Sequence, residues 1–226
     1  MFLGHIRNLF FLVAFHFYAK PKISKTDHVE IFHFKLLVPP SVFHPNLYFS
    51  SKFLGDFLQQ IKFTNKTVLD MGCGSGILSL LAAAKGARVT SLDINPAAVL
   101  ATQENAVRNN LDRNIIALQS DLFDKLDPAN SKFDYILLNP PYHIGIPENI
   151  TEVAWKSGNN YEFVKKFASQ AGNFLTPHGT ILFVVSSDTN IPQILHMFEL
   201  EHFRLQCVHS QHVLFEKLFI YKTVRP

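Results

Sequence analysis

Beyond residue 66, short apolar segments alternate with longer segments in which apolar residues recur every three or four positions. The apolar segments predict strands at 67–71, 88–92, 114–119, 133–138 and 179–185. The amphipathic segments predict helices at 76–85, 95–109, 161–175 and 190–200. Strands that alternate with helices are typical of crossover units, which build a parallel α/β sheet with helices on both faces.

The last apolar segments break this alternation. Residues 203–210 and 213–222 are separated only by a turn near Ser210-Gln211-His212, with no helix between them. Two strands this close in sequence pair as an antiparallel hairpin. We therefore expect an open α/β sheet that ends in a reversed strand.

The N-terminal segment at 9–19 is apolar and rich in Phe. It is too short to span a bilayer, which needs about 20 residues, and no A-x-A cleavage pattern follows it. We expect a helix that packs on the domain, in a cytoplasmic protein without stable membrane insertion. A targeting or membrane-surface segment is the alternative.

The elements before the alternating region are less regular. Residues 20–30 read as a polar linker, 31–38 as a strand and 50–61 as a helix. We therefore divide the chain into an N-terminal helix and strand appendage, 1–38, and a main domain, 39–226.

Composition narrows the class of protein. The chain has 226 residues, 47% of them hydrophobic and 17% charged, which suits a single globular domain with a short appendage. A net charge of +3 falls short of a dedicated nucleic-acid-binding domain but does not exclude an RNA substrate. The two cysteines, Cys73 and Cys207, exclude a disulfide scaffold and a Cys-rich zinc module, and we predict no metal site.

A glycine-rich loop follows the first predicted strand of the alternating region, with the sequence Asp70-Met71-Gly72-Cys73-Gly74-Ser75-Gly76. Glycines let the backbone turn tightly and let a ligand approach it. No Lys follows them, which excludes a phosphate-binding P-loop, and the third glycine of a dinucleotide fingerprint would stand at residue 77, which is Ile. The loop predicts a ligand site beyond the carboxyl ends of the strands.

Acidic residues lie at three successive strand ends. Asp70 precedes the glycine loop, Asp93 ends the next strand, and Asp121 follows the third. Asp93 stands near the position of a ribose-binding carboxylate, and Asp121 could accept from an exocyclic amino group with Leu122 against the ring. Together they predict an acid-lined nucleoside pocket. Taken singly, Asp93 could be a helix N-cap and Asp121 a turn residue.

The fourth strand is followed by Asn139-Pro140-Pro141-Tyr142. The prolines make this loop rigid. The side-chain carbonyl of Asn139 and the backbone carbonyl of Pro140 can accept both hydrogens of one planar NH2 group, on which Tyr142 can stack. Such acceptors position the nitrogen and stabilise the positive charge that develops on it during group transfer, so no strong base is needed beforehand. A proline-rich turn without function is the alternative.

These motifs resemble class I S-adenosylmethionine-dependent methyltransferases, in the methyltransferase small-domain branch whose members carry an N-P-P-[YFW] loop. The resemblance covers about residues 38–186, with compatible strands to about 222. It implies a Rossmann-like seven-stranded sheet of order 3-2-1-4-5-7-6 with strand 7 antiparallel and helices on both faces.

The resemblance also implies S-adenosylmethionine as cofactor and assigns site residues. The implied cofactor contacts are Asp70, Gly72, Cys73, Gly74, Gly76, Asp93, Ile94, Asp121 and Leu122. Phe43 lies in a stretch that helps to close the cofactor pocket in this branch, so a contact with the cofactor is implied there too. The implied acceptor residues are Asn139, Pro140, Pro141 and Tyr142.

Three subfamilies differ in the acceptor. Release-factor glutamine methyltransferases share the N-P-P-Y loop, ribosomal-RNA guanine-N2 methyltransferases often have N-P-P-F-H-x-G, and transfer-RNA adenine-N6 enzymes form a third similar group. The continuation His143-Ile144-Gly145 and the mildly basic charge favour a base in ribosomal or transfer RNA. Protein glutamine is the first alternative, and a small molecule or DNA is a further one. A non-catalytic methyltransferase-fold subunit and a nicotinamide dehydrogenase are the other hypotheses.

Overall fold

The computed structural model describes residues 25–47 and 49–224. The predicted N-terminal helix at 9–19 lies outside these residues. Within the described part of the chain, no helix combines the length and apolar character needed to cross a bilayer.

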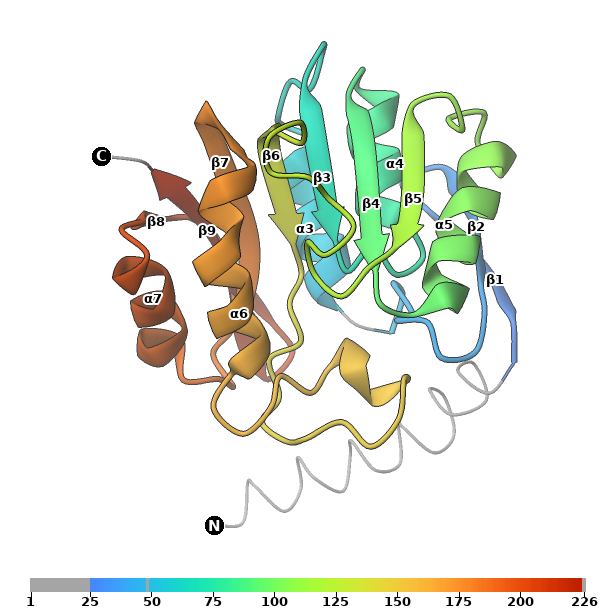
Figure 1. The fold of residues 1–226 in the computed structure, drawn as a ribbon. Coiled ribbons are helices and arrows are strands. Elements are labelled where there is room, and N and C mark those ends of the chain that lie inside the picture. The colour runs from blue at the N-terminus through green and yellow to red at the C-terminus, as the bar shows by residue number, and fades with distance from the viewer. Residues whose placement is uncertain (1–24, 48, 225–226) are drawn as a thin grey trace, which may run out of the picture.

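A seven-stranded sheet forms the centre of the molecule, in the order β5-β4-β3-β6-β7-β9-β8 (Figure 1). Its strands are β3 (Thr67–Met71), β4 (Arg88–Asp93), β5 (Ile115–Gln119), β6 (Phe133–Leu138), β7 (Leu175–Ser186), β8 (Arg204–Val213) and β9 (Glu216–Val224). Strands β3 to β7 are parallel to one another, whereas β9 is antiparallel to both β7 and β8. The predicted strand order and the reversed seventh strand are therefore confirmed.

Helices cover both faces of this sheet. The helices α3 (Phe49–Leu58), α4 (Ile77–Ala84) and α5 (Pro96–Arg108) contribute to one apolar core, and α6 (Glu162–Ala171) and α7 (Ile191–Leu200) contribute to the other. Neighbouring residues of one strand alternate between the cores: Leu182 belongs to the first and Phe183 to the second. In Figure 1, α6 lies in front of the sheet and α3 and α4 lie behind it.

The N-terminal part differs from the prediction of a linker followed by one strand. Residues Asp27–Ile31 form β1 and Phe34–Val38 form β2, and the two pair as a separate antiparallel hairpin. Phe32 and His33 make the turn with positive φ angles of 53° and 70°. Aromatic residues rarely adopt this conformation, so the sequence shows no turn signal there.

Two boundaries near the C-terminus also differ. Strand β7 begins at Leu175, before Pro177, and the helix predicted to reach 175 ends at Ala171, followed by a 3-10 turn, η3 (Gly172–Phe174). The turn predicted near 210–212 is wrong, because those residues belong to β8 and the chain reverses at Leu214-Phe215. Two exposed apolar residues form that turn, so a prediction that looks for polar residues at turns does not find it.

Candidate active site

A cavity opens at the carboxyl ends of four neighbouring parallel strands. Its walls include residues 72–75 after β3, 93–95 at the end of β4, 120–122 after β5 and 139–143 after β6. Carboxyl ends of parallel strands meet at one edge of a sheet, which is where ligands bind in open α/β folds. The structure therefore brings three of the predicted strand-end motifs and most of the glycine loop to one cavity.

The glycine loop is held by the end of the neighbouring strand. The amide groups of Gly72 and Cys73 both donate to the carbonyl of Leu92, at 2.8 and 3.0 Å. Gly76 has a φ of 80°, and a Cβ there would lie 3.0 Å from the side chain of Thr102. Gly76 thus permits close packing of α4 on α5, and it does not line the cavity.

Asp93 lines the cavity and is oriented by backbone amides. Its Oδ2 accepts from Gly74 N at 2.9 Å and its Oδ1 accepts from Asn95 N at 2.9 Å. Burial raises the pKa of Asp93, while these hydrogen bonds oppose the rise. Each carboxylate oxygen can accept a second hydrogen bond, so the side chain retains acceptor capacity for a ligand with neighbouring hydroxyls.

Asp70 does not line the cavity. It is 1% exposed, and its Oδ2 accepts from Ser79 Oγ of α4 at 2.5 Å. Burial raises its pKa to about 6, an effect that the hydrogen bond from Ser79 partly offsets. The structure therefore places two of the three predicted acids, Asp93 and Asp121, at the cavity and the third behind the glycine loop.

Cys73 lies at the cavity wall as a buried thiol. Its Sγ accepts from Thr102 Oγ1 at 3.2 Å. Burial raises the pKa of the Cys73 thiol well above its ordinary value, and the carboxylate of Asp93 adds to the rise. The side chain is therefore an uncharged packing group rather than a nucleophile.

A mixed polar and apolar end of the cavity lies beyond Asp93. The predicted residues Ile94, Asp121 and Leu122 meet there, together with Phe163 of α6. Asp121 is exposed and forms an ion pair with Lys166 of α6 at 2.8 Å. This arrangement suits a flat heterocycle held between apolar side chains, with a carboxylate at its edge.

Asn139 stands at the other end, after β6. Its Nδ2 donates to Ser51 Oγ of α3 at 2.9 Å, and its Oδ1 is buried with no hydrogen-bond partner among the described residues. Pro140 and Pro141 are buried, and Tyr142 is half-buried at the cavity wall. An unpaired buried acceptor in a cavity is costly unless a ligand completes it.

One wall of the cavity lies in the connection after β6 and was not predicted from the sequence. It includes Ile150, Val153, Ala154 and Trp155. The amide of His143 donates to Trp155 O at 2.9 Å, and Gly145 and Gly158 exchange two backbone hydrogen bonds of 3.0 Å. These pairs bring Trp155 and the 3-10 helix η2 (Glu152–Ala154) to the cavity. The length of the connection between β6 and α6 could have indicated this wall, because a connection longer than about 15 residues is usually functional.

The predicted contact residue Phe43 also lines the cavity, and its ring centroid lies 6.4 Å from that of Trp155. The neighbouring residues Ser41 and Val42 line it as well. His44 does not: it is buried, and its Nε2 lies 3.1 Å from Asp27 Oδ2 of β1. No group of three or more metal-ligating side chains occurs within residues 25–47 and 49–224.

Comparison with known proteins shows the same architecture. The family model described as "Methyltransferase small domain" matches residues 33–215. A Methanocaldococcus jannaschii protein, provisionally named protein N5-glutamine methyltransferase, is 33% identical over 201 residues, which are 85% of this chain and 96% of the relative.

Two solved structures share the fold. The E. cuniculi Mtq2–Trm112 complex, described as responsible for methylation of the eRF1 translation termination factor, has a chain with a TM-score of 0.64 and 19% identity, covering 82% of this chain and 99% of that one. A T. thermophilus 16S rRNA N2 methyltransferase, solved with AdoMet (S-adenosylmethionine) and guanosine, gives a TM-score of 0.66 and 22% identity over 89% of this chain and 50% of that one. The family model and the M. jannaschii relative show that the chain belongs to the methyltransferase small-domain family, and its cofactor is S-adenosylmethionine.

Proposed function

We propose that this protein is an N-methyltransferase that transfers the methyl group of S-adenosylmethionine to a planar NH2 group. The observation that carries the proposal is the buried, unpaired Oδ1 of Asn139 in the cavity wall. Because Nδ2 of the same amide donates to Ser51, the oxygen keeps its full capacity to accept a hydrogen bond. An NH2 group is the donor that this acceptor and the Pro140 carbonyl can hold together.

The residues at the other end fit the cofactor. Asp93 would accept from the ribose hydroxyls, the backbone of 72–74 would lie against the rest of the nucleoside, and Asp121 and Leu122 would hold the base. S-adenosylmethionine supplies an electrophilic methyl group on a sulfonium. The paired backbone groups of the glycine loop keep this end of the cavity in shape before a ligand arrives.

The Asn139 end would prepare the acceptor nitrogen. The Asn139 side-chain carbonyl and the Pro140 carbonyl would hold its two hydrogens and so orient its lone pair for transfer. As the nitrogen–carbon bond forms and the carbon–sulfur bond of the bound cofactor breaks, the same acceptors would stabilise the positive charge on nitrogen. The proton then leaves an acidic ammonium-like nitrogen to water, so a strong base in the cavity is not required.

The chemistry around the cavity favours a protein glutamine amide as the acceptor over an RNA base. No Lys or Arg of the described chain lines the cavity, whereas RNA recognition relies on phosphate contacts with such residues. Exposed isoleucines follow Tyr142 instead, with Ile144 and Ile146 60% and 66% exposed. Exposed apolar side chains next in sequence to cavity residues suit a polypeptide, and the M. jannaschii relative, which matches nearly end to end, bears a glutamine methyltransferase name.

A base in RNA is the second candidate. The half-buried ring of Tyr142 offers a face on which a base could stack, next to His143-Ile144-Gly145. The T. thermophilus structure with guanosine supports this candidate at the level of the fold.

The test is transfer of labelled methyl to separated RNA and protein fractions. We expect label in protein, with methylglutamine recovered after digestion and identified by mass spectrometry. An Asn139→Ala variant sets the background, and Asn173→Ala, which changes an exposed asparagine outside the cavity, should behave as wild type. Label in RNA alone would favour the second candidate, and label in neither fraction would contradict the proposal.

A further inference from the structure

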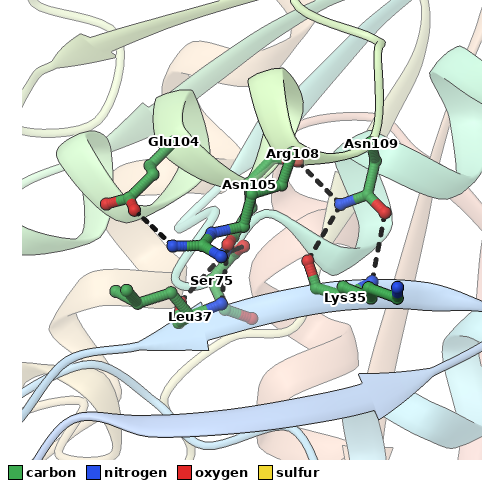
Figure 2. Close-up of polar contacts among 7 residues, drawn as sticks. All are labelled: Lys35, Leu37, Ser75, Glu104, Asn105, Arg108 and Asn109. Carbon is green, nitrogen blue, oxygen red and sulfur yellow. Dashed lines mark hydrogen bonds and ion pairs between the residues drawn. The ribbon is translucent and has the colours of Figure 1, made fainter.

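Two asparagines at the end of α5 pair with the outer edge of β2 (Figure 2). Asn105 Oδ1 accepts from Leu37 N at 2.7 Å, and its Nδ2 donates to Leu37 O at 2.9 Å. Asn109 does the same with Lys35, at 3.1 and 3.0 Å. Four helix residues rise about 6 Å and two strand residues about 6.7 Å, so these amides meet alternate strand residues. They take the place of a neighbouring strand.

The two asparagines differ in one contact. Asn105 Nδ2 also donates to Ser75 O at 2.9 Å, and Ser75 belongs to the glycine loop and lines the cavity. The amide of Asn109 turns instead to the carbonyl of Asn105, at 2.7 Å. Asn105 is fully buried, so its side-chain amide forms hydrogen bonds to these protein groups and not to water. Of the two asparagines, only Asn105 connects β2 to the glycine loop.

The chain beyond Leu37 continues into the cavity wall. After Pro39-Pro40 it reaches Ser41, Val42 and Phe43, which line the cavity. The carbonyl of Ser41 accepts from Asn95 Nδ2 at 2.9 Å. Phe43 Cβ lies 3.9 Å from the position that a Cβ on Gly74 would occupy. Residues 37–41 are therefore fixed at both ends by asparagines of the α5 region, and Phe43 follows directly over the glycine loop.

We propose that Asn105 is a positioning residue for cofactor binding. Its single amide fixes Ser75 of the glycine loop against Leu37, and thereby sets where Ser41 to Phe43 lie relative to that loop. Asn105 itself does not line the cavity. This inference rests on the cofactor site proposed above. Loss of the amide leaves the carbonyls of Ser75 and Leu37 without this donor and loosens the spacing of two cavity walls, while the acceptor end around Asn139 is unchanged.

The test compares Asn105→Ala with Asn109→Ala, its matched control. Both variants lose a pair of hydrogen bonds to β2, so both should lower the melting temperature. Calorimetry should show that Asn105→Ala weakens binding of S-adenosylhomocysteine about tenfold, with KM for S-adenosylmethionine raised similarly and kcat within about twofold. Asn109→Ala should change Kd and KM by less than about twofold.

Three results would overturn the inference. The first is a wild-type Kd for Asn105→Ala, and the second is an equal loss of affinity in both variants, which would make docking of the hairpin the cause. The third uses the wild type alone, should Asn105→Ala not fold: hydrogen exchange should slow in residues 35–43 as well as 72–76 when S-adenosylhomocysteine binds, and slowing confined to 72–76 contradicts the role. Failure of the wild type to bind this ligand would overturn the cofactor site as well.

Discussion

The two ends of the cavity treat their polar groups differently. At the cofactor end, the carboxylate of Asp93 accepts from the amides of Gly74 and Asn95, so its geometry is set within the protein. At the acceptor end, Asn139 is anchored through Nδ2 to Ser51, but its Oδ1 is buried without a partner among the described residues. The cofactor end is therefore preorganised by hydrogen bonds within the protein. The acceptor end keeps an oxygen without a hydrogen bond, which a substrate would supply.

A second unpaired acceptor sharpens this contrast. Asp70 Oδ1 is also buried without a partner in the described chain, yet Asp70 lies outside the cavity. An unpaired buried acceptor costs about 1–3 kcal/mol wherever it lies. An acceptor that lies at the cavity can recover this free energy when a ligand binds. An acceptor outside the cavity only reduces stability. The contrast predicts a loss of catalysis at Asn139 and a change in pH-dependent stability at Asp70.

The largest effect should follow from Asn139→Ala. Removal of one group that stabilises developing charge typically lowers kcat by about 10²–10³-fold. Binding of S-adenosylhomocysteine, measured by calorimetry, should change by less than about threefold, because Asn139 lies at the acceptor end. Loss of cofactor binding in this variant would show that the two ends are not separate.

Asp70→Asn should remove a pH dependence of stability. The pKa of Asp70 is about 6 in the folded chain, above its ordinary value. As pH rises, the Asp70 carboxyl group therefore stays protonated to a higher pH in the folded chain than in the unfolded chain. The free energy of unfolding therefore falls between about pH 4 and pH 6, by about 3 kcal/mol from this group, and levels off above. Urea unfolding across this range should show a smaller fall for the variant.

The same variant also separates Asp70 from the cofactor site. Since Asp70 does not line the cavity, the affinity of Asp70→Asn for S-adenosylhomocysteine at neutral pH should stay within about threefold of wild type. A tenfold loss of affinity would instead support the direct contact between Asp70 and the cofactor that the family resemblance implies.

Asp93→Asn tests the cofactor end. Hydrogen bonds to a charged acceptor contribute about 1.5–3 kcal/mol each, so loss of the charge should weaken S-adenosylhomocysteine binding about 10–100-fold. At saturating cofactor, kcat should fall far less than in Asn139→Ala. Asp112→Asn, at an exposed acid outside the cavity, is the control and should match wild type.

Ser51→Ala should reduce catalysis less than Asn139→Ala does. The substitution removes the partner of Asn139 Nδ2 without touching its Oδ1, so the amide loses its fixed orientation and kcat should fall about tenfold. The neighbouring Ser50 is buried, has an unpaired Oγ and does not line the cavity, which makes Ser50→Ala a matched control. Equal activity of the two variants would contradict the anchoring role of Ser51.

Local pattern was enough to predict the sheet and the strand-end motifs. Glycines and Asp93 follow apolar strands directly, and the carboxyl ends of such strands must meet at one edge. The orientation of Asp70 was beyond local pattern, because it depends on Ser79 of α4, which turns the carboxylate away from the cavity.

The wall around Trp155 could not be located from local pattern either. It reaches the cavity through backbone pairs of residues far apart in the connection, such as His143 with Trp155 and Gly145 with Gly158. The turns at Phe32-His33 and Leu214-Phe215 were missed because their residues are apolar or aromatic, and Phe32, His33 and Leu214 adopt positive φ in spite of it. Packing of the hairpin and the sheet around them overrides local preference.

The reversed strand β9 has a consequence for biosynthesis. It lies between β7 and β8, and its residues Leu218 and Ile220 are completely buried. Once β7 has left the ribosome, it presents an unpaired apolar edge until β9 has been synthesised and has emerged as well. During this interval the emerging polypeptide is exposed to non-native strand pairing, so we expect soluble yield to depend on chaperone supply as well as on the stability of the finished protein.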